Sequence, residues 1–313
     1  MSTNHRISFR RILCPIGLTP DSDEALRYAM TLARSYGAKL IVLHCIGNHD
    51  ATNSIERGYI EEILEYSIKK HIGQSAPATF ETEIILADGD PQVAITREAA
   101  NRRIDLIVMR SRRRPYAAAL LGSTAESVCR TAPCPVLVTH QHEQQWAGVA
   151  TSEAGLQRVL VAYDFSSDAE LALSYALSLV QEYQAELHLL HVLPPRAKPD
   201  TPEIAFLPFG VGTSFNAIAS RLSLAVPDEA RLWCKLKPAV REGQPYRETL
   251  AYAEEQNIDL ICMGASGTGF GMRALFGSNA DRVLRQAPCP ILIARPLKPA
   301  VATPVALVHE LEI

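Results

Sequence analysis

The sequence contains no apolar run that approaches the roughly 18 to 20 residues needed to cross a bilayer, and its opening residues lack the apolar stretch of a signal peptide. We therefore expect a cytoplasmic protein with no membrane partner. The seven cysteines are scattered and never spaced as Cys-x-x-Cys, which argues against a zinc knuckle or a disulfide framework. The formal net charge of -3 provides no general attraction for nucleic acid.

The sequence also lacks the short motifs of several enzyme classes. There is no Gly-x4-Gly-Lys-Ser/Thr loop, no Gly-x-Gly-x-x-Gly after the first expected strand of either half, and no Gly-x-Ser-x-Gly around Ser266. His188 and His191 lie three apart on an expected strand, so they point to opposite faces and are not expected to share a metal ion. We therefore predict no catalytic residue and no metal ligand.

What the sequence does contain is an internal repeat. The segment 105–109 (DLIVM) recurs at 259–263 (DLICM), and 132–138 (APCPVLV) recurs at 287–293 (APCPILI), at offsets of 154 and 155. Earlier in the chain, 11–15 corresponds to 158–162 at an offset of 147, which places a net insertion between the second and third strands of the second repeat. A chain of 313 residues is long enough for two domains that each bury a core.

Each repeat alternates short apolar runs with helical patterns. The runs 159–163, 187–192, 260–263 and 291–294 are typical of strands buried on both faces. Between the first two, Ser166 or Ser167 caps an expected helix whose first turn carries Asp168 and Glu170. Strands that alternate with helices predict right-handed crossovers and a parallel, doubly wound α/β sheet.

Three segments of the second repeat are expected to end at one edge of this sheet, where ligands bind in open parallel sheets. They are Ala162 to Asp164, the segment that ends at Val192, and Met263-Gly264. The Asp164 carboxylate can accept hydrogen bonds from a ribose hydroxyl or an adenine amino group. It can also cap the next helix, and the two roles are compatible.

A glycine-rich stretch follows the last of these segments. Gly264 and Gly267 allow backbone amides to turn inward and form an anion nest, and Gly277 opens a helix whose first residues are Ser278 and Asn279. Its unpaired N–H groups and the Ser278 hydroxyl are suited to phosphate oxygens. Taken alone, the same glycines also fit an ordinary turn.

The run Gly264-x2-Gly267-x9-Gly277-Ser278, with Asp164 upstream and the apolar run 287–293 behind it, resembles the ATP-binding branch of the universal stress protein family. The resemblance covers nearly the whole chain as two tandem domains. It implies two open-sheet, Rossmann-like domains of the adenine nucleotide alpha hydrolase-like type, with parallel five-stranded sheets paired about a pseudo-two-fold axis through their last strands, 136–139 and 291–294. The expected boundaries are domain 1 at 1–142, a linker at 143–156, domain 2 at 157–297 and a tail at 298–313.

Carried over by position, the resemblance implies two groups of ligand contacts in domain 2. The adenosine is framed by Ala162, Asp164 and Val192; the ribose and phosphates are held by Met263, Gly264, Gly267, Gly277, Ser278 and Asn279. The implied ligand is ATP, with AMP or another adenine nucleotide as alternatives, with or without Mg²⁺.

The first repeat departs from this pattern. Gly17 stands in place of Asp164, Arg110 in place of Gly264, and Arg113 or a gap in place of Gly267, so we expect no ATP site there. The basic run Arg110 to Arg114 is suited to an anion or an acidic surface, or is simply a solvated loop. Only Tyr116 accompanies it as an aromatic, which makes nucleic acid a weak expectation.

These observations predict a regulatory or sensor module of a stress response that binds one adenine nucleotide in domain 2. Its two domains are expected to pair within the chain, and the module is expected to act through a regulatory protein partner. Further homodimerisation is left open. Two alternatives remain. One is a slow ATPase or nucleotide-transfer enzyme that uses the same pocket; the other is an interaction scaffold that binds no nucleotide.

Overall fold

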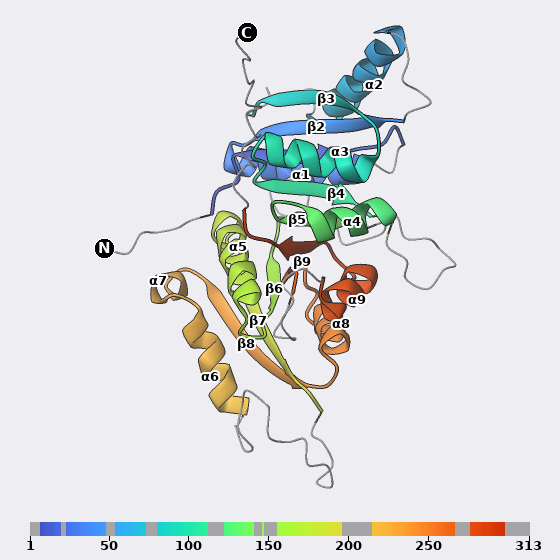
Figure 1. Cartoon of the computed structure of the whole chain (residues 1–313). Helices are drawn as coiled ribbons and strands as arrows, with labels where there is room; N and C mark the ends of the chain where they lie inside the picture. Colours follow the sequence, from blue (N-terminus) through green and yellow to red (C-terminus); the bar gives the residue numbers. More distant parts are fainter. Residues whose placement is uncertain are drawn as a thin grey trace, which may run out of the picture.

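The computed structural model describes residues 7–19, 23–47, 54–72, 80–111, 122–140, 146, 155–195, 215–266 and 276–297. The first half contains β1 (Arg11–Pro15), α1 (Asp23–Tyr36), β2 (Lys39–Ile46), α2 (Ser54–Ile72), β3 (Thr82–Asp88), α3 (Pro91–Asn101), β4 (Leu106–Arg110), α4 (Ser123–Thr131) and β5 (Val136–Thr139). The second half contains β6 (Arg158–Ala162), α5 (Ser167–Tyr183), β7 (Glu186–Leu193), α6 (Phe215–Ala225), α7 (Asp228–Arg231), β8 (Lys235–Glu242), α8 (Pro245–Glu255), β9 (Leu260–Gly264), α9 (Ser278–Gln286) and β10 (Ile291–Ala294). Figure 1 colours the first half blue to green and the second half yellow-green to red.

The strands form one ten-stranded sheet in the order β3-β2-β1-β4-β5-β10-β9-β6-β7-β8. Strands within each half run parallel, and β5 and β10 pair antiparallel at the centre. One face is covered by α1, α2, α5 and α6, and the other by α3, α4, α8 and α9. The predicted α/β architecture of two doubly wound halves joined through their last strands is therefore confirmed.

The central strand pair contains a pseudo-two-fold axis. Leu137 is directly opposite Leu292, and the two are equivalent positions of the internal repeat. On either side, Val136 pairs with Ile293 and Val138 with Ile291. All of these residues are buried. An edge strand of each half is thus covered by the other half, which removes two edges that would otherwise be open to aggregation.

Four charged side chains repeat this symmetry on the helices beside the joint. Within α4, Arg130 Nη2 lies 3.0 Å from Glu126 Oε1, and within α9, Arg285 Nε lies 2.9 Å from Asp281 Oδ2. Across the joint, Arg285 Nη2 lies 3.1 Å from Glu126 Oε2, and Arg130 Nη2 lies 3.7 Å from Asp281 Oδ1. Each arginine therefore bridges both domains, and the network ties α4 to α9.

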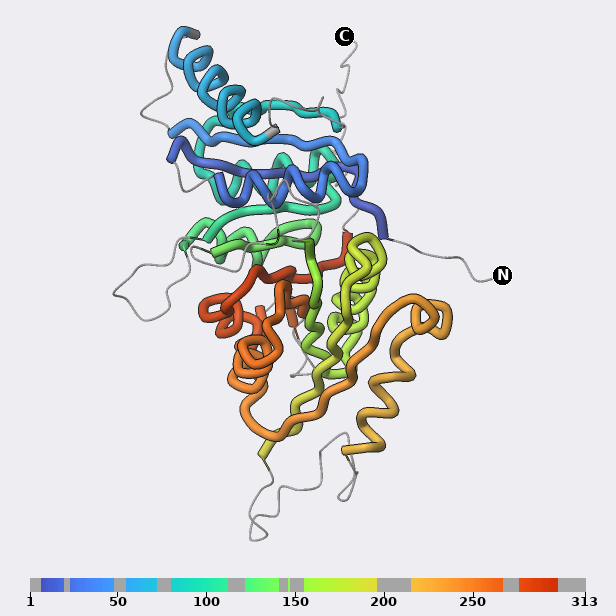
Figure 2. The backbone as a smooth tube through the Cα atoms, turned by 180° about the vertical axis from the view of Figure 1, so that it is seen from behind, coloured from blue at the N-terminus to red at the C-terminus, as the bar shows by residue number. Residues whose placement is uncertain are grey.

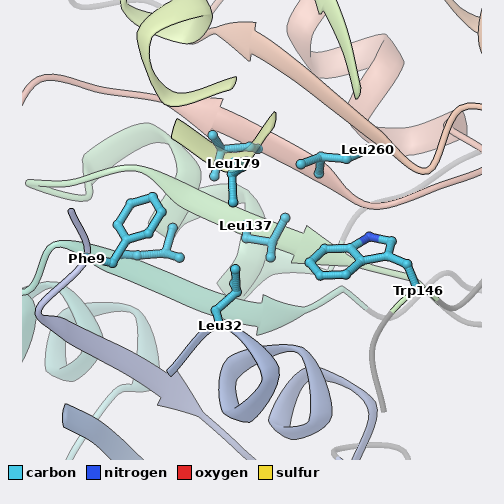
Figure 3. A pocket seen from close by; sticks show the side chains of 8 residues that line it. Phe9, Leu32, Leu137, Trp146, Leu179 and Leu260 are labelled. Atoms are coloured by element: carbon cyan, nitrogen blue, oxygen red, sulfur yellow. The ribbon is translucent and has the colours of Figure 1, made fainter. Parts of the chain in front are cut away.

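Aromatic side chains fill the opposite face of the joint. Phe9 packs on Tyr36 and Tyr175 with ring centroids 5.0 and 6.0 Å apart, whereas Trp146 packs on Tyr28 and Tyr183 at 4.9 and 5.6 Å. Tyr28 and Tyr36 are the repeat equivalents of Tyr175 and Tyr183, so Trp146 occupies the place related to Phe9 by the axis. Figure 3 shows both rings beside leucines from the two halves.

Trp146 was not anticipated, because it lies within the predicted polar linker 143–156. Most of that linker, the tail 298–313 and residues 196–214 of the β7–β8 connection lie outside the described residues, so the domain boundaries stay a prediction. The predicted insertion does fall between β7 and β8, where the described chain includes α6 and α7. Figure 2 shows these two helices in orange along one side of the second half, by the edge strand β8.

Local sequence signals explain where the site-bearing elements begin. Ser166 caps α5 by accepting a hydrogen bond from Ala169 N at 3.2 Å, which decides between the two predicted capping serines. Gly277 is the N-cap of α9, as expected. No helix within the described ranges has the length and apolarity required to cross a bilayer.

Candidate functional site

The predicted site residues of domain 2 lie at the carboxyl edge of its sheet. Ala162 ends β6, Val192 is the second-last residue of β7, and Met263 and Gly264 end β9. In the sheet, β6 lies between β9 and β7, so the strand order reverses beside it. This reversal is the position at which doubly wound sheets bind ligands.

The start of α9 is brought to the same edge. The Gly277 amide donates to the Ala265 carbonyl at 2.8 Å, which fixes the first turn of α9 beside the end of β9. Ser278 and Asn279 follow in that turn and are exposed. Gly267, the remaining predicted contact, lies outside the described residues, as do Gly269 and Gly271.

Asp164 is held in a tight turn. Its Oδ1 accepts hydrogen bonds from Ser166 N at 3.0 Å and from Ser166 Oγ at 2.5 Å. Since Ser166 is the N-cap of α5, Asp164 orients the cap without being the cap itself. Asp164 therefore does have a structural role at the start of α5, one of the two roles that the sequence left open. Asp164 is half-buried and follows the end of β6.

Gly264 is required by close packing. A Cβ atom at this position would lie 2.6 Å from Asp168 Cβ and 2.9 Å from the Asp168 carbonyl carbon. Asp168 Oδ2 also accepts the Ser266 amide at 3.0 Å. One amide of the predicted anion nest is therefore bonded to a protein carboxylate, a contact that the sequence analysis missed.

Domain 1 has a different arrangement at the equivalent place. The Arg110 side chain is about 9% exposed, and its Nε lies 3.7 Å from Glu24 Oε2 on α1. Burial raises the pKa of Glu24, whereas the charge of Arg27 lowers it. A buried guanidinium thus stands where domain 2 has a glycine, and Glu24 stands where domain 2 has Leu171. The remaining arginines of the basic run, 112–114, lie outside the described residues.

Both domains use a histidine to tie the first two strands together. His191 Nδ1 lies 2.8 Å from the Tyr163 carbonyl oxygen, and its repeat equivalent His44 lies 2.9 Å from the Ile16 carbonyl oxygen. Because a carbonyl only accepts, each Nδ1 is the donor. Burial lowers the pKa of His191, which favours the neutral ring. The structural role expected for His191 is present in both repeats.

His188 contacts a different element. It is fully buried, its Nδ1 lies 2.9 Å from Tyr252 Oη on α8, and its Nε2 lies 3.5 Å from Glu186 Oε1. His191 contacts Tyr163 and Phe165 instead, so the two histidines face opposite sides of the sheet, as predicted. Within the described ranges, no three His, Cys, Asp or Glu side chains gather at a place suited to a metal ion.

The burial of His188 predicts a loss of stability in acid. Burial lowers the pKa of His188 from 6.5 to about 4, partly opposed by the Glu186 carboxylate. Between pH 6.5 and pH 4 the unfolded chain binds more protons than the folded chain does. The free energy of unfolding is therefore highest above pH 6.5 and falls by about 3 kcal/mol as the pH drops towards 4. Urea unfolding of wild type and His188→Gln from pH 4 to 7 measures this. An unchanged pH slope in the variant would assign the effect to other groups.

Two further side chains near Asp164 were not anticipated. Phe165 has a left-handed backbone with φ of 62°, and the Arg221 guanidinium carbon lies 4.6 Å from the centre of its ring. The sequence shows no signal for this contact, because Arg221 lies on α6, in the β7–β8 connection, far from Phe165 along the chain. Only the folded chain brings α6 against the end of β6.

Comparison with known proteins agrees with this architecture. The family model described as "Universal stress protein family" matches residues 8–140 and 155–295. The chain belongs to the universal stress protein family. Both halves of the internal repeat are thus domains of this family, arranged in tandem.

Relatives with the same tandem length occur among mycobacteria. A universal stress protein of Mycobacterium tuberculosis strain H37Rv is 26% identical over 295 residues, which cover 88% of this chain and 93% of the relative. One of Mycolicibacterium smegmatis is 27% identical over 304 residues, covering 91% and 97%. The tandem arrangement therefore recurs in universal stress proteins of similar length.

Solved structures of the family include both tandem and shorter proteins. A universal stress protein from Archaeoglobus fulgidus covers 92% of this chain and 98% of its own length at 25% identity, with a TM-score of 0.63. A shorter universal stress protein, solved in complex with cAMP, covers 42% of this chain at 21% identity with a TM-score of 0.33. That second likeness is confined to one domain and assigns no ligand to this chain.

Proposed function

We propose that this universal stress protein binds one adenine nucleotide, ATP in the first place, in domain 2, and acts as a regulatory or sensor module rather than as an enzyme. Domain 1 serves as its structural partner. The bound state is read by a protein partner in the cytoplasm. AMP and cyclic nucleotides are alternative ligands of the same site.

The contrast between Gly264 and Arg110 carries this proposal. At the end of β9, Gly264 leaves no side chain and the start of α9 approaches the strand end. At the equivalent end of β4, the Arg110 side chain is buried beside Glu24. A phosphate-bearing ligand needs exposed groups at a helix start, and the exposed Ser278 and Asn279 in the first turn of α9 support such a site in domain 2.

The proposed contacts divide by chemistry. Ala162, Asp164 and Val192 frame the adenosine, with the Asp164 carboxylate as hydrogen-bond acceptor for the ribose or the adenine amino group. The ribose and phosphates are held by Met263, Gly264, Gly267, Gly277, Ser278 and Asn279. Any Mg²⁺ that accompanies the nucleotide takes most of its ligands from phosphate oxygens and water, as this ion commonly does.

Isothermal titration with ATP, AMP and cAMP tests the proposal, together with mass spectrometry of small molecules released from the purified protein. We expect one site per chain and recovery of intact nucleotide. Two equivalent sites would contradict the assignment of domain 1. Turnover above background that Asp164→Ala abolishes would support the enzyme alternative, and no binding with an unchanged melting temperature at millimolar ATP would support the scaffold.

A pair of variants separates the ligand role of Asp164 from its role in the turn. Asp164→Ala removes both the proposed nucleotide contact and the acceptor for Ser166, whereas Ser166→Ala removes the cap of α5 and keeps the carboxylate. Loss of a serine cap costs about 1 kcal/mol of stability. We expect Asp164→Ala to weaken nucleotide binding at least about tenfold, a hydrogen-bond loss of roughly 1.4 kcal/mol.

Ser166→Ala is expected to lower the melting temperature while keeping most of the affinity. Asp90→Ala is a matched control in domain 1, because Asp90 caps α3 by accepting the Gln92 amide at 2.7 Å. If Asp164→Ala weakens binding no more than Asp90→Ala does, the Asp164 carboxylate is not a ligand contact.

A further inference from the structure

Phe165 follows Asp164 directly and has an unusual backbone conformation. Its φ of 62° lies in the left-handed region, which costs a residue with a side chain roughly 1–2 kcal/mol. Residues are kept in this region only where their surroundings compensate the cost. The contacts of the Phe165 ring are therefore part of what maintains the turn.

Side chains from three described residues lie against the ring. Tyr163 and His191 meet it edge to face, with centroids 5.1 and 5.0 Å away and interplanar angles of 75° and 61°. The guanidinium carbon of Arg221 lies 4.6 Å from the ring centroid, a cation–π arrangement. Two contacts come from the strand ends of the site, and the third comes from α6.

The ring and the Asp164 carboxyl are mechanically linked. Asp164 Oδ1 accepts two hydrogen bonds from Ser166, so the turn closes around Phe165. A change in the backbone of Phe165 therefore reorients the carboxyl on one side and the cap of α5 on the other. The charges of Asp164 and Arg221 have opposite effects on His191. Burial is the main cause and lowers the pKa of His191, the hydrogen bond to the Tyr163 carbonyl and the Asp164 charge raise it, and the Arg221 charge lowers it.

Domain 1 lacks the same combination. The equivalents of Asp164 and Phe165 are Gly17 and Leu18, and Leu18 is 43% exposed. The histidine contact to the strand end, by contrast, occurs in both domains. The stack of Phe165 and Arg221 therefore occurs in the domain that has the Asp164 carboxylate, and it is not a feature shared by both repeats.

We propose that Arg221 is a positioning residue of the nucleotide site: by stacking on Phe165 it stabilises the turn that presents the Asp164 carboxyl to the ligand. This inference rests on the nucleotide site proposed above. It makes α6, an element of the β7–β8 connection, part of what sets nucleotide affinity.

The alternative is that the Arg221 guanidinium contacts the phosphates itself. The two roles differ in their dependence on the ligand. Asp164 is placed against the nucleoside, so a positioning effect is equal for adenosine, AMP and ATP. A direct phosphate contact instead becomes stronger as phosphates are added, because each adds negative charge.

Isothermal titration of wild type, Arg221→Ala and Arg221→Lys with adenosine, AMP and ATP distinguishes the two. A cation–π contact at an exposed site is worth about 0.5–1 kcal/mol, so Arg221→Ala is expected to raise all three Kd values roughly two- to fivefold. Arg221→Lys keeps a cation over the ring and restores part of the affinity. Arg231→Ala is the control, because it removes the same charge from neighbouring α7 and leaves the three Kd values unchanged.

Phe165→Leu, alone and combined with Arg221→Ala, tests whether the arginine acts through the ring. If it does, the double variant binds no more weakly than Phe165→Leu. Additive losses, a loss that grows from adenosine to ATP, or wild-type affinity in Arg221→Ala would each overturn the inference and leave the proposed function intact. Absence of binding in wild type itself would overturn the proposed function.

Discussion

Gly264→Arg, which introduces the residue that domain 1 has at this position, is expected to weaken nucleotide binding strongly. The first atom of any side chain here would lie 2.6 Å from Asp168 Cβ and 2.9 Å from the Asp168 carbonyl carbon. The second of these is backbone, so relief requires α5 or the end of β9 to move. Overpacking of this kind costs about 1–3 kcal/mol, and a cost of 2 kcal/mol raises Kd about 30-fold.

The measurement is nucleotide affinity and stoichiometry, with circular dichroism to confirm folding. If Gly264→Arg fails to fold, Gly264→Ala provides the same test with the smallest side chain, which already meets both Asp168 atoms. Retention of wild-type affinity in Gly264→Ala would show that the ligand site lies elsewhere.

Arg110→Gly is the matched exchange in domain 1. It removes the buried guanidinium beside Glu24 but leaves Gly17, without a carboxylate, at the end of β1. We expect it to lower stability, because the buried Glu24 loses a nearby cation, and to create no second site. A stoichiometry of two would mean that Arg110 alone blocks domain 1.

Trp146→Ala is expected to cost about 3–5 kcal/mol of unfolding free energy, the range for removing a large buried aromatic side chain. Trp146 is 4% exposed and packs between Tyr28 of α1 and Tyr183 of α5. Its loss therefore weakens the joint between the domains and not one domain alone. Urea unfolding followed by circular dichroism measures the cost.

Trp146→Phe is a control supplied by the pseudo-symmetry. On the other side of the axis, Phe9 packs between the equivalent tyrosines, so a phenyl ring suits this environment. In addition, Trp146 Nε1 is buried without a hydrogen-bond partner in the part of the chain that the structure describes, and phenylalanine removes that group. We expect a cost below about 1.5 kcal/mol, as for tolerated apolar exchanges. Equal costs for both variants would contradict a role of aromatic packing in the joint.

Much of the fold could be predicted because most strands are short apolar runs and the runs repeat; β8, with Lys237, Pro238 and Arg241 in its interior, is an exception. The strands 136–139 and 291–294, which the family resemblance implied, coincide with β5 and β10. One of the two predicted capping serines, Ser166, begins α5, and α9 begins at Gly277 as predicted. Strands buried on both faces contain no polar positions that blur their limits, and capping depends on single local residues. These features are local, so the sequence is sufficient for them.

The contacts that connect distant segments were not predictable in the same way. Asp168 bonds to Ser266, 98 residues away, and Arg221 stacks on Phe165 from a helix whose position follows from packing alone. Trp146 lies in a segment whose polar composition is typical of a linker, so the sequence did not indicate that its side chain is buried. The expectation that each half buries its own core was also too simple, because both core clusters continue across the joint.

The sequence by itself determined that this protein is a tandem repeat of one α/β domain and that only the second copy keeps Asp164 and Gly264. The tertiary structure decided how the copies join about the Leu137–Leu292 pair and that Gly264 is needed for close approach to α5. It also decided that Arg110 is buried at the equivalent place in domain 1. The physical reason is range: periodicity and capping act within a few residues, whereas steric fit and burial depend on which segments the folded chain brings together.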